Sequence, residues 1–565
     1  MSPTLDLAVR GGFVVDGTGA PGTPADVGVR DGRIVEIGTL SGTAARTVDA
    51  SGCVVAPGFI DPHTHLDAQL CWDGAARPTC LHGVTSVVIG LCGFGVAPCP
   101  PDGGEYLLRS LEVVEEIPYE TTSRGVPFEW ASWPEYRAYL GGRALGVNVG
   151  AFVPHSALRY AVMGERARGE VATGDDRADL AAALRRCLAD GALGFATSRG
   201  PNHVDAFGDP VPSRFADDAE LEALVATCRG RVWQINVRTK FSGDARGLTE
   251  EVSRYATWSA TSGARLTWSP LHAEPGTEVW SDVLRHNDGL NRDPALVVAP
   301  QIATAPITTV FRFDRPSAAA FIPGWDALLD GFFELAVDAK LRRLSDASVR
   351  AALRAAPDDP GAMFAPRFDT WIVLASSSDP NAVGSSIAAI AAERGTEPID
   401  ALCDLLIADD LTTIVQVPAV NRDHDAVATL VADEHTLVGL GDAGAHVTSI
   451  SNFAYPSQVL ARLVRDEGVL PLELAVSRMT ARPAALLGLP DRGRIEVGLA
   501  GDLTVFDLDR LRLGRLGVVH DLPGGAPRLF QDAEGYRMVA VNGTVTITDD
   551  EPTGERPGRL LAPAS

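Results

Sequence analysis

The first 60 residues alternate short apolar runs with polar turns, the pattern of a small β-sheet. The runs LAVRGGFVVDG and ADVGVRDGRIVEIG are rich in β-branched residues, which favour strands. Asp31-Gly32 stands between two such runs, where an Asp-Gly pair predicts a tight hairpin turn. The segment ARTVDASGCVVAPGFID continues the same texture. We therefore expect a small sheet at the start of the chain rather than a strand–helix unit.

From residue 61 the pattern changes to short apolar runs separated by longer amphipathic stretches. Strands alternating with helices over roughly 400 residues predict a parallel α/β architecture. Nearly continuous apolar strands suit a sheet that is buried on both faces. The length favours a (β/α)8 TIM-like barrel with an insertion, although periodicity alone does not separate a barrel from an open sheet. The strand-like runs include 85–91, 144–152, 192–197, 231–237, 264–271 and 436–442, and the helix-like stretches include 175–191, 217–230 and 247–263.

The stretch from about 275 to 430 is less regular and holds prolines, aromatics and helix-like segments such as FIPGWDALLDGFFELAV. Two interpretations stay open: an insertion or lid over the site, and a peripheral helix pair without a catalytic role. After residue 480 the chain returns to strands, with Asn542-Gly543 as a second hairpin turn. We predict a barrel domain over 61–480 and a small β-sandwich domain built from both chain ends, 1–60 and 481–565.

Charge and composition narrow the class of partner. The chain of 565 residues carries 49 Lys and Arg against 73 Asp and Glu, a net charge of −24, which disfavours binding to a nucleic-acid backbone. There is no apolar run of about 18 residues, so we expect no membrane span. The first residues also lack the pattern of a secretory signal. The eight cysteines form no CxxC pair and are too sparse for a disulfide scaffold, so we expect a cytoplasmic protein with reduced thiols.

The sharpest chemical signal is GFIDPHTHLD at residues 58–67. His63 and His65 are two positions apart, and such side chains share one face of a strand. At the carboxyl end of a barrel strand they would lie over the mouth, where active sites form. Neutral imidazole is the commonest metal ligand in proteins. Because this His-x-His follows an apolar strand and opens an α/β domain, we interpret it as a metal site rather than as packing.

Two further residues stand at the ends of apolar runs. Cys92 follows TSVVIGL, and a thiolate there is a good zinc ligand, although buried structural cysteines are common. Asp442 ends TLVGLGD, and its carboxylate can bind metal and accept a proton from water. The alternative for Asp442 is a helix N-cap. His446 lies close by, either supporting the site or facing solvent.

Several segments together resemble the amidohydrolase superfamily, and within it the N-acyl-D-amino-acid deacylases, or D-aminoacylases. They include VRDGRIVEIG, GCVVAPGFIDPHTHLDAQ, HGVTSVVIGLCGFGVAP and SRMTARPAALLGLPDRGRIEVGLAGDLTVFD, and the resemblance covers nearly the whole chain. It implies an eight-stranded α/β barrel flanked by a β-sandwich made from both chain ends. It also implies that His63 and His65 are first-strand metal ligands, that Cys92 takes the bridging ligand place, and that Asp442 is both ligand and general acid/base. His155, with Ser156 and Arg159, matches a shared segment near the barrel mouth.

The chain departs from the family at two metal-ligand positions. Asn236 in QINVR and Pro270 in WSPLHA stand where the deacylases carry histidines, while Arg238 is retained and His272 replaces a substrate-binding lysine. The remaining ligands, His63, His65, Cys92 and Asp442, are enough for one divalent metal, with zinc expected. The arginine motif that binds the substrate carboxylate in that family is not evident in GAHVTSISNFAYPS.

The resulting hypothesis is a metal-dependent amidohydrolase that cleaves a C–N amide bond of a small molecule, with D-aminoacylase-like deacylation of an N-acyl amino acid as the favoured reaction. His155, Asn236, Arg238 and His272 are expected to bind substrate or oxyanion; hydrogen bonding at the barrel rim is the alternative. Other functions stay open: hydrolysis of a cyclic amide, lactone or ester, a lyase or decarboxylase reaction, or binding without catalysis. Lys240 is expected to be a solvated lysine rather than a carboxylated metal bridge. The resemblance is also compatible with a homodimer.

Overall fold

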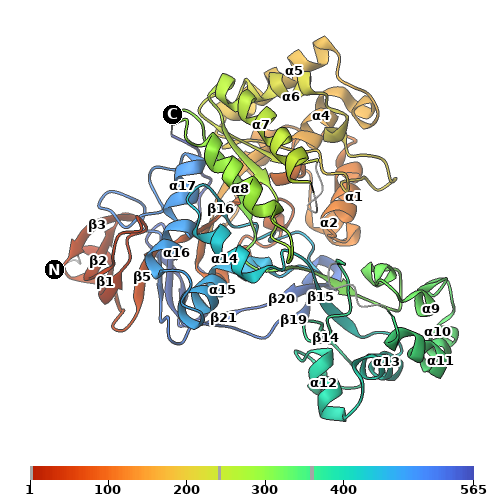
Figure 1. Cartoon of the computed structure of the whole chain (residues 1–565). Helices are drawn as coiled ribbons and strands as arrows, with labels where there is room; N and C mark the ends of the chain where they lie inside the picture. Colours follow the sequence, from red (N-terminus) through yellow and green to blue (C-terminus); the bar gives the residue numbers. More distant parts are fainter. Residues whose placement is uncertain (1–3, 239–243, 357–361, 565) are drawn as a thin grey trace.

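The computed structural model describes residues 4–238, 244–356 and 362–564. Its centre is an eight-stranded parallel sheet that closes into a barrel (Figure 1), which confirms the predicted fold class. Closure lies just beyond the first and last strands, where Thr64 and Ala443 form a parallel bridge and the His65 N–H donates to the Ala443 carbonyl at 2.7 Å. The strands, in hydrogen-bonded order, are β6 (Phe59–Asp61), β7 (Val84–Ile89), β8 (Asn148–Pro154), β9 (Gly194–Ser198), β10 (Val232–Asn236), β11 (Arg265–Ser269), β12 (Val298–Ile302) and β16 (Leu437–Val438).

Helices connect these strands along the outside of the barrel. Thr173, Asp217 and Asp244 each accept a backbone N–H in the first turn of the helix that follows them, which satisfies donors that the helix leaves unpaired. The helices that follow strands β7 to β11 are α1 (Gly104–Val114), α2 (Tyr119–Gly125), α3 (Trp133–Gly141), α4 (His155–Met163), α5 (Gly174–Ala189), α6 (Asp218–Val225), α7 (Ala245–Ser262) and α8 (Val279–Leu290). The last barrel helices are α14 (His424–Ala432), α15 (Tyr455–Gln458), α16 (Leu472–Met479) and α17 (Ala481–Leu487).

The two chain ends build one nine-stranded sheet beside the barrel (Figure 1). Its halves join where β5 pairs antiparallel with β17, with Val55 opposite Val505. Both predicted hairpins are confirmed, because Asp31-Gly32 joins β2 to β3 and Asn542-Gly543 joins β22 to β23, with positive φ at all four residues. The strands are β1 (Leu5–Val14), β2 (Thr23–Arg30), β3 (Arg33–Gly38), β4 (Ala44–Asp49), β5 (Val54–Pro57), β17 (Leu503–Phe506), β22 (Tyr536–Val541), β23 (Thr544–Thr548) and β24 (Glu551–Pro552).

Between β12 and α14 the chain leaves the barrel and forms a separate small unit, seen at the lower right of Figure 1. Its three strands, β13 (Ile307–Phe311), β15 (Ile414–Val420) and β14 (Ile372–Ala375), make an antiparallel sheet. Its helices are α9 (Asp326–Leu329), α10 (Val337–Ser345), α11 (Ala347–Arg354), α12 (Ile387–Arg394) and α13 (Pro398–Ala408). The unit has its own apolar core, which includes Trp325 and Trp371. Helix α8 and strand β12, inside the irregular stretch 275–430, belong to the barrel.

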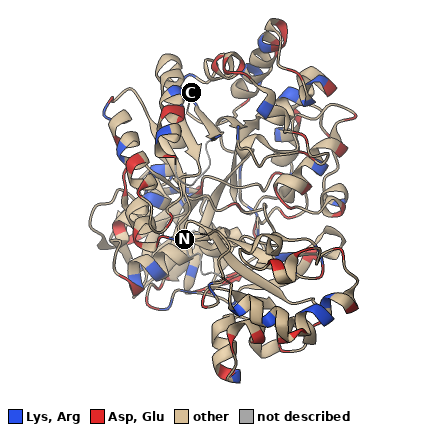
Figure 2. Cartoon of the chain, turned by 45° about the vertical axis from the view of Figure 1, so that its right-hand side comes forward, with Lys and Arg blue, Asp and Glu red and all other residues tan. Residues whose placement is uncertain are grey.

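Charged side chains of both signs are spread over the outer helices (Figure 2). Among the described residues, no helix combines the length and the apolar character that crossing a bilayer demands.

Candidate metal centre

The structure brings His63, His65 and Cys92 together at the mouth of the barrel. Their ligand atoms all lie within 4.8 Å of one another, and all three residues are buried. The Nε2 atom of His63 is 3.2 Å from Sγ of Cys92 and 3.4 Å from Oδ1 of Asp442. The Nε2 atom of His65 is 3.8 Å from the same Asp442 oxygen. Two imidazoles, one thiol and one carboxylate thus converge on one small volume.

Backbone geometry explains why residues so far apart in sequence meet. Asp442 lies just beyond β16 with φ of 46°, and its N–H donates to the His63 carbonyl at 3.1 Å. Cys92 has φ of 54°, in the left-handed region that few side-chain-bearing residues adopt. Its N–H donates to Oε1 of Gln234 at 2.9 Å, a bond that holds the turn after β7 against β10. Cys92 and Asp442, which both have a positive φ, thus both belong to this cluster. Strained backbone of this kind is common at functional sites.

The protonation states of the cluster suit a cation. Burial lowers the pKa of His63 and of His65, so both rings are neutral and keep a lone pair. Burial also raises the pKa of the Cys92 thiol and of the Asp442 carboxyl, because neither charge is solvated. A divalent ion reverses that penalty, since it favours the ionised thiolate and carboxylate. The donor set therefore fits a metal.

A buried carboxyl group, that of Glu115, lies beside His65. Oε1 of Glu115 is 3.3 Å from Nδ1 of His65, and burial raises the pKa of Glu115 to about 8. His446 lies between two carboxylates, 4.0 Å from Glu115 and 3.5 Å from Glu116. Burial lowers the pKa of His446, but these carboxylates outweigh it and raise the pKa to about 9. His446 thus supports the site, one of the two alternatives that the sequence left open, whereas Glu115 carried no signal before the fold was known.

His155 is not brought to the cluster. Its Nδ1 lies 2.8 Å from Oγ1 of Thr197 and its Nε2 lies 2.8 Å from Oε1 of Glu220, so both ring nitrogens are engaged inside the protein. Arg159 bonds the other Glu220 oxygen, and all three side chains are fully buried. This arrangement is a buried hydrogen-bond network, and it leaves His155 no free ring nitrogen for a substrate.

Asn236 lies against the cluster at the end of β10. Its Oδ1 accepts from Nε2 of Gln234 at 2.6 Å and from Oγ of Ser269 at 2.9 Å, and its side chain partly offsets the effect of burial by lowering the pKa of the Cys92 thiol. Asn236 therefore occupies the place expected of a ligand without offering an imidazole. Arg238 is exposed two residues further on, and its backbone N–H donates to Glu251 at 2.8 Å.

Two other predicted positions, Pro270 and His272, follow β11. His272 is buried, and burial lowers its pKa to about 3, so the ring is neutral. Pro270 directly follows β11 and supplies no ligand atom. Lys240 lies outside the described residues.

Comparison with known proteins identifies the family. The model of the "Amidohydrolase family" matches residues 46–547, most of the chain. The chain belongs to the amidohydrolase family. N-acyl-D-glutamate deacylase from Alcaligenes xylosoxydans xylosoxydans is 30% identical, with 99% of this chain and 97% of that protein aligned. D-aminoacylase from the same organism is 29% identical, with 99% and 98% aligned.

Solved structures agree with the family. N-acyl-D-glutamate deacylase from Bordetella bronchiseptica, complexed with zinc and a phosphonate inhibitor, superposes with a TM-score of 0.66 at 27% identity, covering 99% of both chains. This amidohydrolase is therefore a hydrolase of non-peptide C–N bonds, and its family and donor set together support a divalent metal.

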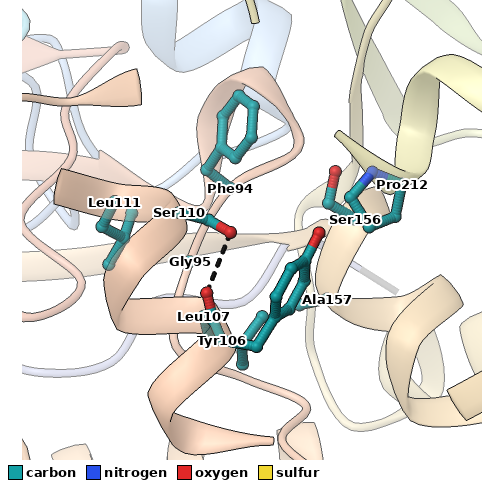
Figure 3. Close-up of a pocket in the computed structure, with 9 residues that line it drawn as sticks. All are labelled: Phe94, Gly95, Tyr106, Leu107, Ser110, Leu111, Ser156, Ala157 and Pro212. Atoms are coloured by element: carbon teal, nitrogen blue, oxygen red, sulfur yellow. Dashed lines mark hydrogen bonds between the residues drawn. The ribbon is translucent and has the colours of Figure 1, made fainter. Parts of the chain in front are cut away.

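Two glutamines of this amidohydrolase orient the first ligands. Oε1 of Gln301, at the end of β12, hydrogen-bonds Nδ1 of His63, and Gln234 holds the Cys92 turn as described above. Neither carried a signal in the sequence, because a glutamine inside an apolar strand has no distinctive spacing. A small cavity lies beside the turn after β7 that carries Cys92. It is bordered by Phe94, Tyr106, Ser110 and Ser156 (Figure 3). Its lining is mostly apolar and contains none of the four ligands, so the cavity is distinct from the metal centre.

Proposed function

We propose that this amidohydrolase removes the acyl group from small N-acyl amino acids, with one zinc ion per chain held by His63, His65, Cys92 and Asp442. The observation that carries this proposal is the convergence of these side chains, with Asp442 within 3.4 Å of His63. A set of two imidazoles, a thiolate and a carboxylate is typical of zinc. Bound there, zinc supplies Lewis acidity toward a water molecule and the scissile carbonyl.

Asp442 supplies the proton transfers. Its Oδ1 faces both histidines, which leaves Oδ2 as the atom that accepts a proton from the attacking water. As the new C–O bond forms and the C–N bond breaks, the same oxygen returns that proton to the leaving nitrogen. Asn236 and His272, at the ends of β10 and β11, are proposed to position the substrate.

We also infer that the enzyme works in the cytoplasm. None of its eight cysteines is in a disulfide, which supports a reducing compartment.

The test is the substitution Asp442→Asn in metal-loaded enzyme, assayed for amine release from N-acetyl amino acids of both hands. We expect turnover to fall by about 10²- to 10⁴-fold. Metal content, measured by elemental analysis, should stay close to that of the wild type, because the other three ligands remain. Asp338→Asn, on the exposed start of α10, is the matched control. Full turnover by the Asp442 variant would contradict the proposal.

A further inference from the structure

The loop that carries Asp442 has a strained backbone. Leu440, Asp442 and His446 all have positive φ, at 50°, 46° and 44°, in the left-handed region that residues with a side chain seldom adopt. Backbone of this kind persists only where the surrounding structure holds it in place. Residues 439–451 form this Asp442 loop, and its shape therefore depends on contacts from the rest of the molecule.

Two consecutive turns link Asp442 to the far end of the loop. The Ala445 N–H donates to the Asp442 carbonyl at 2.9 Å, and the Ser449 N–H donates to the His446 carbonyl at 2.8 Å. Because the second turn starts where the first one ends, the position of Ser449 limits where Asp442 can lie. Ser449 is buried, and its Oγ donates to Oε2 of Glu116 at 2.6 Å, which ties it to the segment after α1.

The insertion also binds Ser449. Oγ1 of Thr308, on β13, donates to the Ser449 carbonyl at 2.9 Å. Strand β13 is the first strand of the insertion, and it follows barrel strand β12 along the chain. Since Ser449 is buried and Thr308 half-buried, solvent has little access with which to replace this hydroxyl as a partner of the carbonyl. One hydrogen bond thus joins the insertion directly to the Asp442 loop.

A hairpin near the end of the chain adds a third contact. Its strands are β19 (Gly517–Leu522) and β20 (Ala526–Phe530), and β19 contacts β14 of the insertion (Figure 1). The Leu529 N–H donates to the Val447 carbonyl at 2.6 Å, and Val447 packs against Ile117. The barrel, the insertion and the C-terminal hairpin therefore hold neighbouring positions of the Asp442 loop.

We propose that Thr308 is a positioning residue: through its bond to Ser449, the insertion fixes the Asp442 loop and keeps the Asp442 carboxylate in place for proton transfer. The inference rests on the proposed function, in which Asp442 moves the proton. It assigns the insertion a part in catalysis, although none of the four metal ligands belongs to it. Loss of the Thr308 hydroxyl should slow the chemical step and leave substrate binding unchanged.

The experiment uses Thr308→Val, which keeps the shape of the side chain and removes its hydroxyl. In zinc-loaded enzyme with N-acetyl-D-leucine or N-acetyl-D-glutamate, we expect kcat to fall about tenfold and KM to change by less than about twofold. Hydrogen exchange of the backbone amides over 443–450 should quicken in the same variant, and this readout needs no turnover. Thr308→Ser keeps the hydroxyl and should restore both kcat and slow exchange.

Thr309→Val is the matched control. Thr309 is the next residue of β13 and is also half-buried, and its side chain lies on the opposite face of the strand. This variant should match the wild type in kcat and in exchange. Ser449→Ala, which removes the bond to Glu116, is a second variant that should reproduce the effect of Thr308→Val, and it keeps the inference testable if Thr308→Val does not fold.

Equal exchange over 443–450 in Thr308→Val and Thr309→Val would overturn the inference, as would an unchanged kcat in Thr308→Val. A loss of kcat that Thr308→Ser does not restore would also overturn it, because the hydroxyl would not be the cause. Absence of hydrolysis by the wild type would refute the deacylase proposal instead. Faster exchange in Thr308→Val and not in Thr309→Val would then still support the hold of Thr308 on the loop.

Discussion

The Nδ1 atom of His63 is hydrogen-bonded to Oε1 of Gln301, on a strand that lies 238 positions later in the chain. Because the amide oxygen can only accept, Nδ1 carries the proton and Nε2 presents its lone pair. That lone pair faces Cys92 and Asp442. The pairing therefore selects the tautomer that can bind a metal.

Replacing Gln301 with Leu should weaken metal binding because it removes the group that orients His63. Loss of such an outer-shell partner typically lowers metal affinity by about 10- to 100-fold. Competition with a zinc chelator measures the change. Gln416→Leu, which removes a comparably buried glutamine from the insertion, is the matched control and should leave affinity unchanged. Equal affinities for both variants would show that the Gln301 bond has no role in orientation.

Glu115 should matter through its oxygen atom near Nδ1 of His65 rather than through its bulk. We expect Glu115→Leu to lower zinc affinity by about 10-fold or more, and Glu115→Gln to keep most of it, since an amide oxygen still accepts from the ring. The same chelator competition applies. If Gln and Leu were equally damaging, negative charge and not hydrogen bonding would be the contribution of Glu115.

Metal content should be about one zinc per chain in protein prepared without added metal, and His63→Ala with His65→Ala should abolish it. Removal of the metal by a chelator should abolish hydrolysis, and zinc should restore it. A variant with His286→Ala and His520→Ala, two histidines far from the four ligands in sequence, controls for the loss of imidazoles. Two metals per chain would mean that other residues join the site. A metal content of zero would exclude the proposed mechanism.

Acid should destabilise the insertion through Asp409. Burial raises the pKa of this carboxyl, but hydrogen bonds from the Ser378 N–H and from Oγ1 of Thr413 outweigh burial and hold it at about 2. A depressed native pKa contributes stability that is present above the unfolded pKa of about 3.9 and is lost as pH falls through about 2. The contribution near pH 7 is about 2 kcal/mol.

Asp409→Asn should therefore lower the free energy of unfolding at pH 7. The difference in this free energy between the variant and the wild type should shrink as the pH falls from 5 to 2. Urea unfolding at a series of pH values measures this. Asp410→Asn, its exposed neighbour, should track the wild type throughout. A gap that stays constant with pH would rule out the carboxylate as the cause.

The insertion should also unfold separately when its core is weakened. Trp371 is fully buried and packs edge-on against Phe311, with centroids 5.0 Å apart, in a core distinct from that of the barrel. Trp371→Ala should cost about 3–5 kcal/mol. Hydrogen exchange should quicken between β13 and β15 while the barrel strands stay protected. Phe321→Ala, a 73% exposed aromatic of the same unit, should change neither region, and equal loss of protection in the barrel would contradict separate cores.

The sequence by itself determined the local structure and the fold class. Apolar periodicity predicted the barrel strands, and Asp31-Gly32 and Asn542-Gly543 predicted the two hairpins, because these signals depend on near neighbours in the chain. His63, His65, Cys92 and Asp442 were recognisable because each directly follows an apolar strand, and the ends of parallel strands meet at one face of a barrel.

Tertiary structure alone decided which polar groups serve those ligands. Glu115, Gln234 and Gln301 come from three separate segments, and their pairing with His65, Cys92 and His63 depends on barrel closure, which no local pattern encodes. His155 shows the reverse case, since a residue at the right strand end turned toward Glu220 instead of the mouth. Position along a strand is a property of sequence, whereas the partner of a buried polar atom is set by whatever the fold packs against it.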